Sequence, residues 1–138
     1  MTNPRPHHLN LAGTKVEETA AFYRQMLNLA PIELPRITEG YAADIFTLED
    51  EHGYQYHIIP DDPDFATRNN LPINPVGGGH LAFRVDDLAA IRAKLDAIGV
   101  PYSDMGVWSI RGWHQLFCTD PEGRIIEFHQ VVDEKGGE

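Results

Sequence analysis

Two similar stretches, HLNLAGTKVEETAAFYRQMLNL (8–29) and HLAFRVDDLAAIRAKLDAIG (80–99), decide the fold. Each begins with a short run whose alternate side chains would face opposite sides of a β-strand. Each continues with apolar residues three or four positions apart, which predicts an amphipathic helix. A strand followed by a helix therefore occurs twice, at a period of about 70 residues that indicates an internal duplication.

Residues that favour helix ends flank both predicted helices. Thr14 precedes the first helix, and Glu17 follows three positions later, which is the spacing of a capping box. Asp86 or Asp87 can cap the second helix, and Gly99 is placed to end it. The apolar stripes that should face the sheet are Val16, Ala20, Tyr23 and Leu27 in the first helix and Leu88, Ile91 and Leu95 in the second.

Three further strand candidates follow each helix, separated by turn sequences such as EHG and DPEG. Each half therefore has the order strand–helix–strand–strand–strand. This order predicts an α+β fold of two βαβββ modules in tandem, with a curved sheet around a shared cavity. The strand candidates are 31–37, 42–50 and 54–60 in the first half and 100–106, 113–120 and 124–132 in the second.

The chain of 138 residues has the length of one domain with its own core. We expect a single domain over 1–138, made of a module at 7–61 and a module at 79–132. The connection 60–79 is rich in Pro, Asp, Asn and Gly and has no hydrophobic periodicity. A loop of this length is either a functional flap over a site or a solvated linker, and both interpretations stay open.

Composition and charge exclude several classes of partner. The formal net charge of −10 argues against binding to nucleic acid or to an anionic membrane surface. No apolar run approaches the about 20 residues needed to cross a bilayer, and the first residues lack the apolar region of a secretory signal. Cys118 is the only cysteine, so no disulfide can form within the chain. We expect a cytoplasmic protein that binds a small-molecule substrate.

Histidines at matching places in the two halves are the first candidates for chemistry. His7 and His8 lie on the first strand of one half, and His80 lies on the first strand of the other. Glu127 lies on the last strand, after the DPEG turn. Two imidazoles and one carboxylate are a known ligand set for divalent iron, manganese, nickel or zinc with open coordination positions. Spacing alone does not separate such a site from strand histidines that hold no metal.

Over about residues 7–130 the sequence resembles the vicinal oxygen chelate superfamily, which includes glyoxalases, bleomycin resistance proteins and extradiol dioxygenases. Three motifs in the family's order carry the resemblance: HLNLAGTKVEETAAFYRQMLNL (8–29), GGGHLAFRVDDLAAIRAKLDAIGV (77–100) and TDPEGRIIEF (119–128). The resemblance implies the glyoxalase-like fold with a metal-binding cavity.

The resemblance also implies which residues hold the metal. The interval to the aromatic pair Phe22–Tyr23 matches His8 rather than His7, and His80 and Glu127 occupy the other two ligand positions. We expect one divalent transition metal per chain, with Fe(II) as first choice and Ni, Zn or Mn as alternatives. Such an ion leaves coordination positions open for two neighbouring oxygens of a substrate.

Three functions are consistent with this resemblance. The favoured one is a dioxygenase that acts on a small aromatic or vicinal-oxygen substrate. The second is a non-redox glyoxalase-type lyase or isomerase, or a fosfomycin-type thiol transferase. The third is a small-molecule binding or drug-resistance protein without turnover. The three ligand-competent residues argue against this last class, whose members lack such ligands.

His57, in YQYHIIP (54–60), is the catalytic candidate. In glyoxalases and epimerases of the family the equivalent region supplies a fourth ligand, and in extradiol dioxygenases it supplies an acid–base histidine. The titration range of an imidazole fits proton transfer. Gln55 and Tyr56 are alternatives, because the strand register does not follow from the sequence.

Candidate substrate contacts lie in the second half. The stretch GWHQLFCTDPEGRIIE (112–127) partly resembles the extradiol signature, although its histidine lies too close to the aromatic and a phenylalanine replaces the family's tyrosine. We also expect a homodimer, because sheet edges and exposed aromatic residues of such modules often find a partner. The substrate-binding candidates are Trp108, Arg111, His114, Phe117 and His129.

Overall fold

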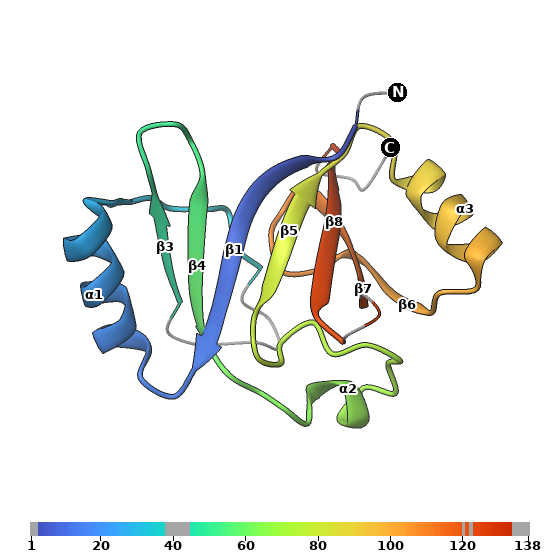
Figure 1. Cartoon of the computed structure of the whole chain (residues 1–138), viewed down its shortest axis with the longest axis horizontal. Coiled ribbons are helices and arrows are strands. Elements are labelled where there is room, and N and C mark those ends of the chain that lie inside the picture. Colours follow the sequence, from blue (N-terminus) through green and yellow to red (C-terminus); the bar gives the residue numbers. More distant parts are fainter. Residues whose placement is uncertain (1–2, 38–44, 120, 122, 134–138) are drawn as a thin grey trace.

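An antiparallel pair of strands, β1 (Arg5–Gly13) and β5 (His80–Arg84), forms the centre of the fold (Figure 1). The computed structural model of the chain describes residues 3–37, 45–119, 121 and 123–133. On either side of the central pair, β4 (Gln55–Pro60) runs parallel to β1, and β8 (Ile125–Val131) runs parallel to β5. These four strands carry most of the residues discussed below.

The remaining strands extend the sheet outward by antiparallel pairing on both sides. The result is an eight-stranded mixed sheet of order β2-β3-β4-β1-β5-β8-β7-β6, in which the second half repeats the first. The predicted α+β fold of βαβββ modules is therefore confirmed. The outer strands are β2 (Ala30–Pro31), β3 (Phe46–Glu49), β6 (Tyr102–Val107) and β7 (Trp113–Thr119).

The register of the central pair makes the two halves equivalent residue by residue. His8 lies opposite Ala82, and His80 lies opposite Asn10, so each histidine faces the residue two positions after the other. In the parallel pairs, Asn10 lies opposite His57 and Ala82 lies opposite Glu127. His57 in the first half therefore occupies the place that Glu127 occupies in the second.

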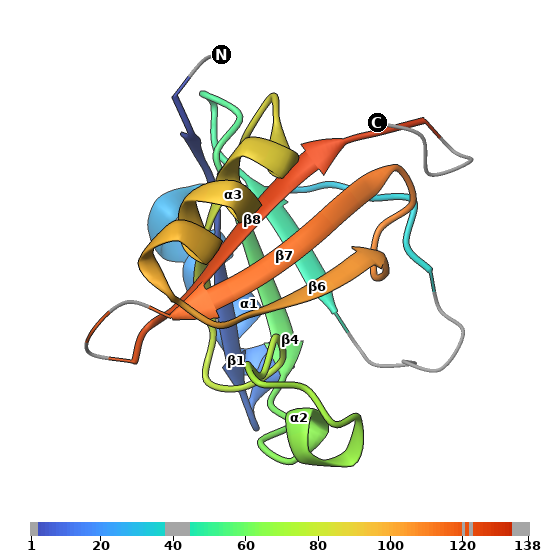
Figure 2. The same ribbon diagram turned by 90° about the vertical axis from the view of Figure 1, so that its right-hand side faces the viewer.

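Helices α1 (Val16–Leu27) and α3 (Leu88–Ile98) cover the outer face of the sheet, each over its own half (Figures 1 and 2). Under α1, Ala20, Leu48 and Ile58 form a buried cluster. Under α3 lies a second cluster that includes Leu88 and Leu116, both completely buried. The apolar stripes of the helices are thus used by the core, while the inner face of the sheet is left for polar residues.

The helix ends agree with the sequence only in part. The Asp87 side chain accepts a hydrogen bond from the Ala90 backbone N–H, which decides between the two predicted caps, and α3 ends at Gly99 in a left-handed conformation, as predicted. The predicted Thr14 cap is wrong, because Lys15 holds the cap position of α1 without a side-chain hydrogen bond. Leu27, placed on the buried stripe, is 45% exposed because it lies in the last turn of α1.

Two segments depart from the predicted strands and loop. The strand predicted at 31–37 is reduced to β2, and the chain beyond it crosses to the second half, where Arg36 bridges Ile110. Pro35 has no N–H to donate to a strand ladder, so a regular strand cannot continue through this residue. The connection 60–79 contains a short helix, α2 (Phe65–Arg68), and packs Phe65 and Val76 into a third cluster. Residues 42–44 and 120 of the predicted strands lie outside the described residues.

None of the described helices is long and apolar enough to cross a membrane.

Candidate functional site

Three strands of the inner face bring His8, His80 and Glu127 together. Ala82 of β5 lies opposite His8 on one side and opposite Glu127 on the other. Its small side chain leaves space between the two, and His80 reaches the same space from two residues earlier on the same strand. The three side chains are almost completely shielded from solvent, with exposed fractions of 1%, 8% and 1%. The register therefore creates a buried cluster of two imidazoles and one carboxylate.

The ligand atoms of this cluster converge on one point. The Nε2 atoms of His8 and His80 lie 3.5 and 3.1 Å from Oε1 of Glu127. One donor atom from each residue lies within 4.8 Å of the other two. Ligands bound at about 2.1 Å and at right angles are about 3 Å apart, so this spacing suits a divalent transition metal. The nitrogen and carboxylate donors fit iron, nickel, zinc or manganese.

Two neighbouring histidines hold the candidate ligands in place. His129 Nδ1 lies 2.7 Å from Glu127 Oε2, and Arg84 Nε donates to His129 Nε2 at 3.0 Å. Because Nε2 accepts from arginine, the proton of His129 is on Nδ1 and is donated to the carboxylate. The His129 ring stacks on Trp113 at 4.2 Å with planes 2° apart. His129 therefore fixes Oε2 and leaves Oε1 facing the His8 and His80 nitrogens.

A β-bulge gives His8 a similar partner. The pairing of β1 with β5 shifts register between Pro6 and His8, and His7 lies at this irregularity. The Nδ1 atoms of His7 and His8 are 2.8 Å apart. A proton on His8 Nδ1 would be donated to His7 and would leave the Nε2 lone pair of His8 free to bind a metal. His7, His8 and His129 also form a second group with ligand-competent spacing.

Burial sets the protonation of these groups. Burial lowers the pKa of His8 and lowers that of His7 to about 3, so both rings are neutral at pH 7. Burial raises the pKa of Glu127, but hydrogen bonds from the surrounding histidines outweigh it and hold that pKa well below 4.5. An ionised carboxylate beside neutral imidazoles is the protonation state that metal binding requires.

His57 and Gln55 face the cluster, whereas Tyr56 points away. His57 and Gln55 are buried on the inner face, and Tyr56 packs against the cluster beneath α1. The His57 ring stacks on His8 with centroids 3.8 Å apart. Burial and the nearby His8 hold the pKa of His57 well below 6.5, so its ring is neutral. The strand register thus removes Tyr56 from the alternatives and leaves His57 at the place equivalent to Glu127.

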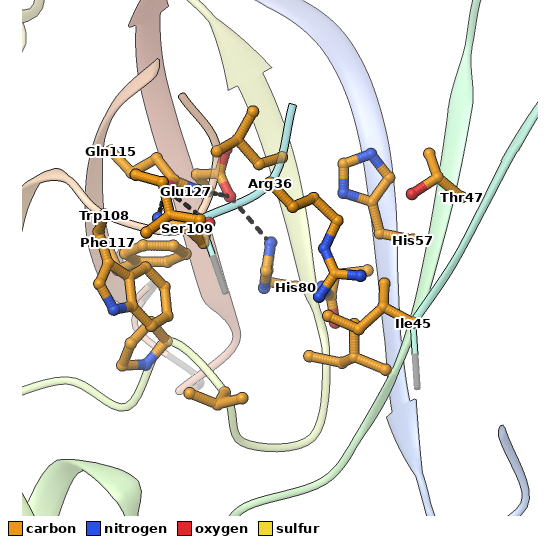
Figure 3. Close-up of a pocket in the computed structure, with 16 residues that line it drawn as sticks. Arg36, Ile45, Thr47, His57, His80, Trp108, Ser109, Gln115, Phe117 and Glu127 are labelled. Carbon is orange, nitrogen blue, oxygen red and sulfur yellow. Dashed lines mark hydrogen bonds and ion pairs between the residues drawn. The ribbon is translucent and has the colours of Figure 1, made fainter. Parts of the chain in front are cut away.

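A cavity of about 60 Å³ opens beside the cluster (Figure 3). Its wall combines polar groups of the inner face with apolar side chains. The buried Oδ1 atom of Asn10, which lies at this cavity, has no hydrogen-bond partner among the described residues. An unpaired buried oxygen is costly, and this one is available to a ligand. The apolar lining includes Ile45, Ile59, Val76, Trp108 and Phe117.

Only some of the predicted substrate contacts lie at the cavity. Trp108 and Phe117 line the cavity, and His129 lies behind Glu127 as described. Arg111 is exposed and is not part of the cavity wall. His114 alternates with the inward-facing residues of β7, and its Nε2 lies 2.7 Å from Asp104 Oδ1. A strand places neighbouring side chains on opposite faces, which explains why His114 points outward.

The cavity residues that the sequence did not predict include Arg36, Asn10 and Gln115. The position of Asn10, two residues after His8, could have indicated that it faces the same side as His8. Gln115 has the same relation to Phe117. Arg36 carries no comparable indication, because it reaches the cavity only through the crossing segment.

The chain belongs to the Glyoxalase/Bleomycin resistance protein/Dioxygenase superfamily, whose family model matches residues 5–128. It is 25% identical over 126 residues to Glyoxylase I 4 of Arabidopsis thaliana, covering 88% of this chain and 67% of that protein. Members of this superfamily commonly bind a divalent metal and a small-molecule substrate and are commonly oligomeric.

Solved structures that share the fold include two methylmalonyl-CoA epimerases. Methylmalonyl-CoA epimerase from Mycobacterium tuberculosis superposes with a TM-score of 0.66 at 18% identity, over 95% of this chain and 90% of that one. A Streptomyces coelicolor methylmalonyl-CoA epimerase variant, in complex with 2-nitronate-propionyl-CoA, superposes with a TM-score of 0.63 at 21% identity, over 94% and 99%.

Proposed function

We propose that this protein is a metal-dependent lyase or isomerase of the glyoxalase and epimerase type, which moves a proton on a small substrate. The observation that carries the proposal is the convergence of His8, His80 and Glu127 beside a cavity that His57 also lines. The similarity to a glyoxylase and to epimerase folds supports proton transfer in preference to oxygen chemistry. Dioxygenase activity, the first expectation from the sequence, becomes the second candidate.

His8, His80 and Glu127 would hold the ion. A bound divalent ion would act as a Lewis acid that stabilises negative charge on the substrate oxygens and acidifies an adjacent C–H group. The same donor set also suits Fe(II) oxygenases, which is why the dioxygenase stays as the second candidate. Phe117 stands where the extradiol signature has a tyrosine, and a phenyl ring cannot donate a hydrogen bond to a catechol.

A chain of hydrogen bonds prepares His57 as a base. Gln55 donates from its amide nitrogen to Glu49 Oε2 at 3.3 Å, which leaves its carbonyl Oε1 facing His57 Nε2 at 2.8 Å. His57 therefore donates its proton from Nε2, and the lone pair is on Nδ1. A neutral imidazole with a fixed tautomer can accept a proton from carbon and return it. Gln55 and Glu49 act through His57 and are positioning residues.

The cavity would supply the conditions that such a step needs. Trp108, Phe117 and Val76 exclude water from one side, which strengthens charge interactions at the metal position. The unpaired Asn10 Oδ1 offers an acceptor to a substrate hydroxyl. The stacking of His57 on His8 keeps the base next to a metal ligand.

A single variant tests the role of His57. We expect His57→Ala to keep the metal but to lose turnover by about 100-fold or more, because a general base contributes that much. Elemental mass spectrometry measures the metal content. Turnover is measured under argon with hemithioacetals and acyl-CoA thioesters as trial substrates. Lower metal affinity instead would make His57 a fourth ligand. Full metal with wild-type turnover would remove His57 from the reaction.

Oxygen separates the two candidate functions. A lyase or isomerase keeps its turnover in the absence of O2, and incubation in D2O should place deuterium on the reacting carbon of the product. Turnover that occurs only with O2 uptake, on a catechol or hydroquinone, would overturn the proposal in favour of the dioxygenase. Gln55→Leu provides a matched check, because it should slow turnover without changing metal content.

A further inference from the structure

We propose that the cavity selects small organic acids and that Arg36 binds their carboxylate; this inference rests on the proposed metal site. The acid would present two neighbouring oxygens to the metal and a separate carboxylate to Arg36.

The backbone of both halves fixes the position of Arg36. Arg36 pairs with Ile110 in an isolated bridge. The Ile37 N–H donates to the Ser109 carbonyl at 2.9 Å, and the Arg111 N–H donates to the Pro35 carbonyl at 2.7 Å. A segment of the first half is therefore tied to the β6–β7 turn of the second. This crossing places the long cationic side chain of Arg36 at the cavity wall. A regular strand within the first half would not bring Arg36 to this position.

The turn that receives the crossing segment is itself anchored to the site. Gln115 Oε1 accepts hydrogen bonds from the Ser109 hydroxyl at 2.7 Å and from the Ser109 backbone N–H at 3.1 Å. The Gln115 amide nitrogen lies 3.5 Å from Glu127 Oε1. A continuous set of contacts thus connects the candidate ligand Glu127 to the segment that carries Arg36, which holds the backbone of that segment in place relative to Glu127.

The Arg36 side chain extends over the cavity (Figure 3). Among the described residues, no carboxylate lies within ion-pair distance of its guanidinium group. Two other arginines each have a carboxylate partner: Arg68 pairs with Asp62, and Arg92 pairs with Asp104. A guanidinium group is always charged and has five N–H donors arranged to match a carboxylate. An unpaired one at a cavity wall offers that geometry to a ligand.

The charges around the cavity favour an anionic ligand once a metal is bound. Among the described residues of the wall, Arg36 and Glu127 carry a formal charge, and these two charges cancel. A divalent ion held by Glu127 and neutral histidines leaves an excess of positive charge in a partly buried space. Because unpaired buried charge is costly, an acid that brings negative charge is favoured over a neutral molecule of the same shape.

The size of the cavity limits the acid. Its volume of about 60 Å³ is far below the several hundred Å³ of a site for a drug-sized ligand. A molecule of a few non-hydrogen atoms fits this space. The remainder of the described wall combines apolar side chains with uncharged polar ones, so a carbon skeleton without further charged groups suits it. These features favour a short-chain carboxylic acid.

Two probes that differ in one carboxylate test the proposal. Acetohydroxamate presents two neighbouring oxygens to a metal, and malonomonohydroxamate adds a carboxylate to the same group. Isothermal titration of the zinc-loaded protein gives the affinity of each, so no activity is needed. We expect the carboxylated probe to bind more tightly, and we expect Arg36→Gln to reduce that preference by about tenfold or more. Arg36→Lys should keep part of the preference, because lysine retains the positive charge but lacks the planar set of N–H donors that matches a carboxylate.

Arg111→Gln is the matched control. Arg111 lies in the turn that contacts the crossing segment, but its side chain is exposed and outside the cavity wall. This variant should keep the preference of the wild-type protein, and all variants should bind acetohydroxamate and zinc equally well. Two results would overturn the role of Arg36 and leave the proposed metal site intact. One is that Arg36→Gln keeps the preference for the carboxylated probe within about twofold. The other is that the wild-type protein shows no such preference. Failure of zinc or of both probes to bind would overturn the proposed function itself.

Discussion

Replacing His129 with phenylalanine should weaken metal binding without removing any ligand. His129 donates to Glu127 Oε2 at 2.7 Å, and both side chains are at most 1% exposed. A hydrogen bond to a buried charge contributes about 1.5–3 kcal/mol, and partners that orient metal ligands typically change affinity by about 10- to 100-fold. We therefore expect the zinc dissociation constant of His129→Phe to rise by about 10- to 100-fold.

The surroundings of His129 allow the hydrogen bond to be removed with little change in packing. A phenyl ring keeps the stack on Trp113, so the change removes the hydrogen bond more than the packing. His129→Gln should recover part of the affinity, because its amide can donate to the carboxylate. His114→Phe serves as control, since that ring lies on the same half but faces away from the site.

Competition with a chromophoric chelator measures the affinity, and thermal unfolding of the metal-free variants checks the fold. If His129→Phe is folded and binds zinc within about threefold of the wild-type protein, His129 does not position Glu127. If all three variants lose affinity equally, the effect comes from general destabilisation of the second half and not from the hydrogen bond.

Three further predictions concern the metal, pH and assembly. Glu127→Ala should remove the only charged ligand and leave the purified protein with well below one metal ion per chain by elemental analysis; wild-type occupancy would refute the ligand set. Burial lowers the pKa of His7 from 6.5 to about 3 and also lowers those of His8 and His57. These rings are neutral in the folded protein where the unfolded chain is protonated, so the free energy of unfolding of the metal-free protein should be highest above pH 6.5. It should fall by up to about 1.4 kcal/mol per pH unit for each neutral histidine as the pH drops below 6.5, and for His7 this loss should continue toward pH 3, as urea titrations would measure. Sedimentation velocity at micromolar concentration should give twice the 15.5 kDa chain mass, and a clean monomer would contradict the homodimer.

The sequence by itself determined the repeated order of strand and helix and the residues that could bind a metal. Alternation and helical spacing are local properties, and they repeat in the two halves around His8 and His80. The helix cap at Asp87 and the helix end at Gly99 could be predicted for the same reason. The resemblance to a superfamily then chose His8 rather than His7 and added Glu127.

Only the tertiary structure decided how the side chains around this cluster are arranged. The pairing register of β1 with β4 turned His57 and Gln55 inward and Tyr56 outward, and a bulge in β1 brought His7 beside His8. Register depends on hydrogen bonds between distant segments, so it cannot be derived from alternation alone.

The choice between two arginines shows the same limit. Arg111 lies in the half that carries the aromatic residues, and the sequence made it one of five candidate substrate contacts, yet its side chain is exposed. Arg36 lies in a segment that the sequence predicted as a strand of the first half, and a crossing to Ile110 brought it to the cavity. Backbone hydrogen bonds between the two halves bring Arg36 to the cavity. Every residue except proline can form such bonds, so the amino-acid sequence does not show where they occur.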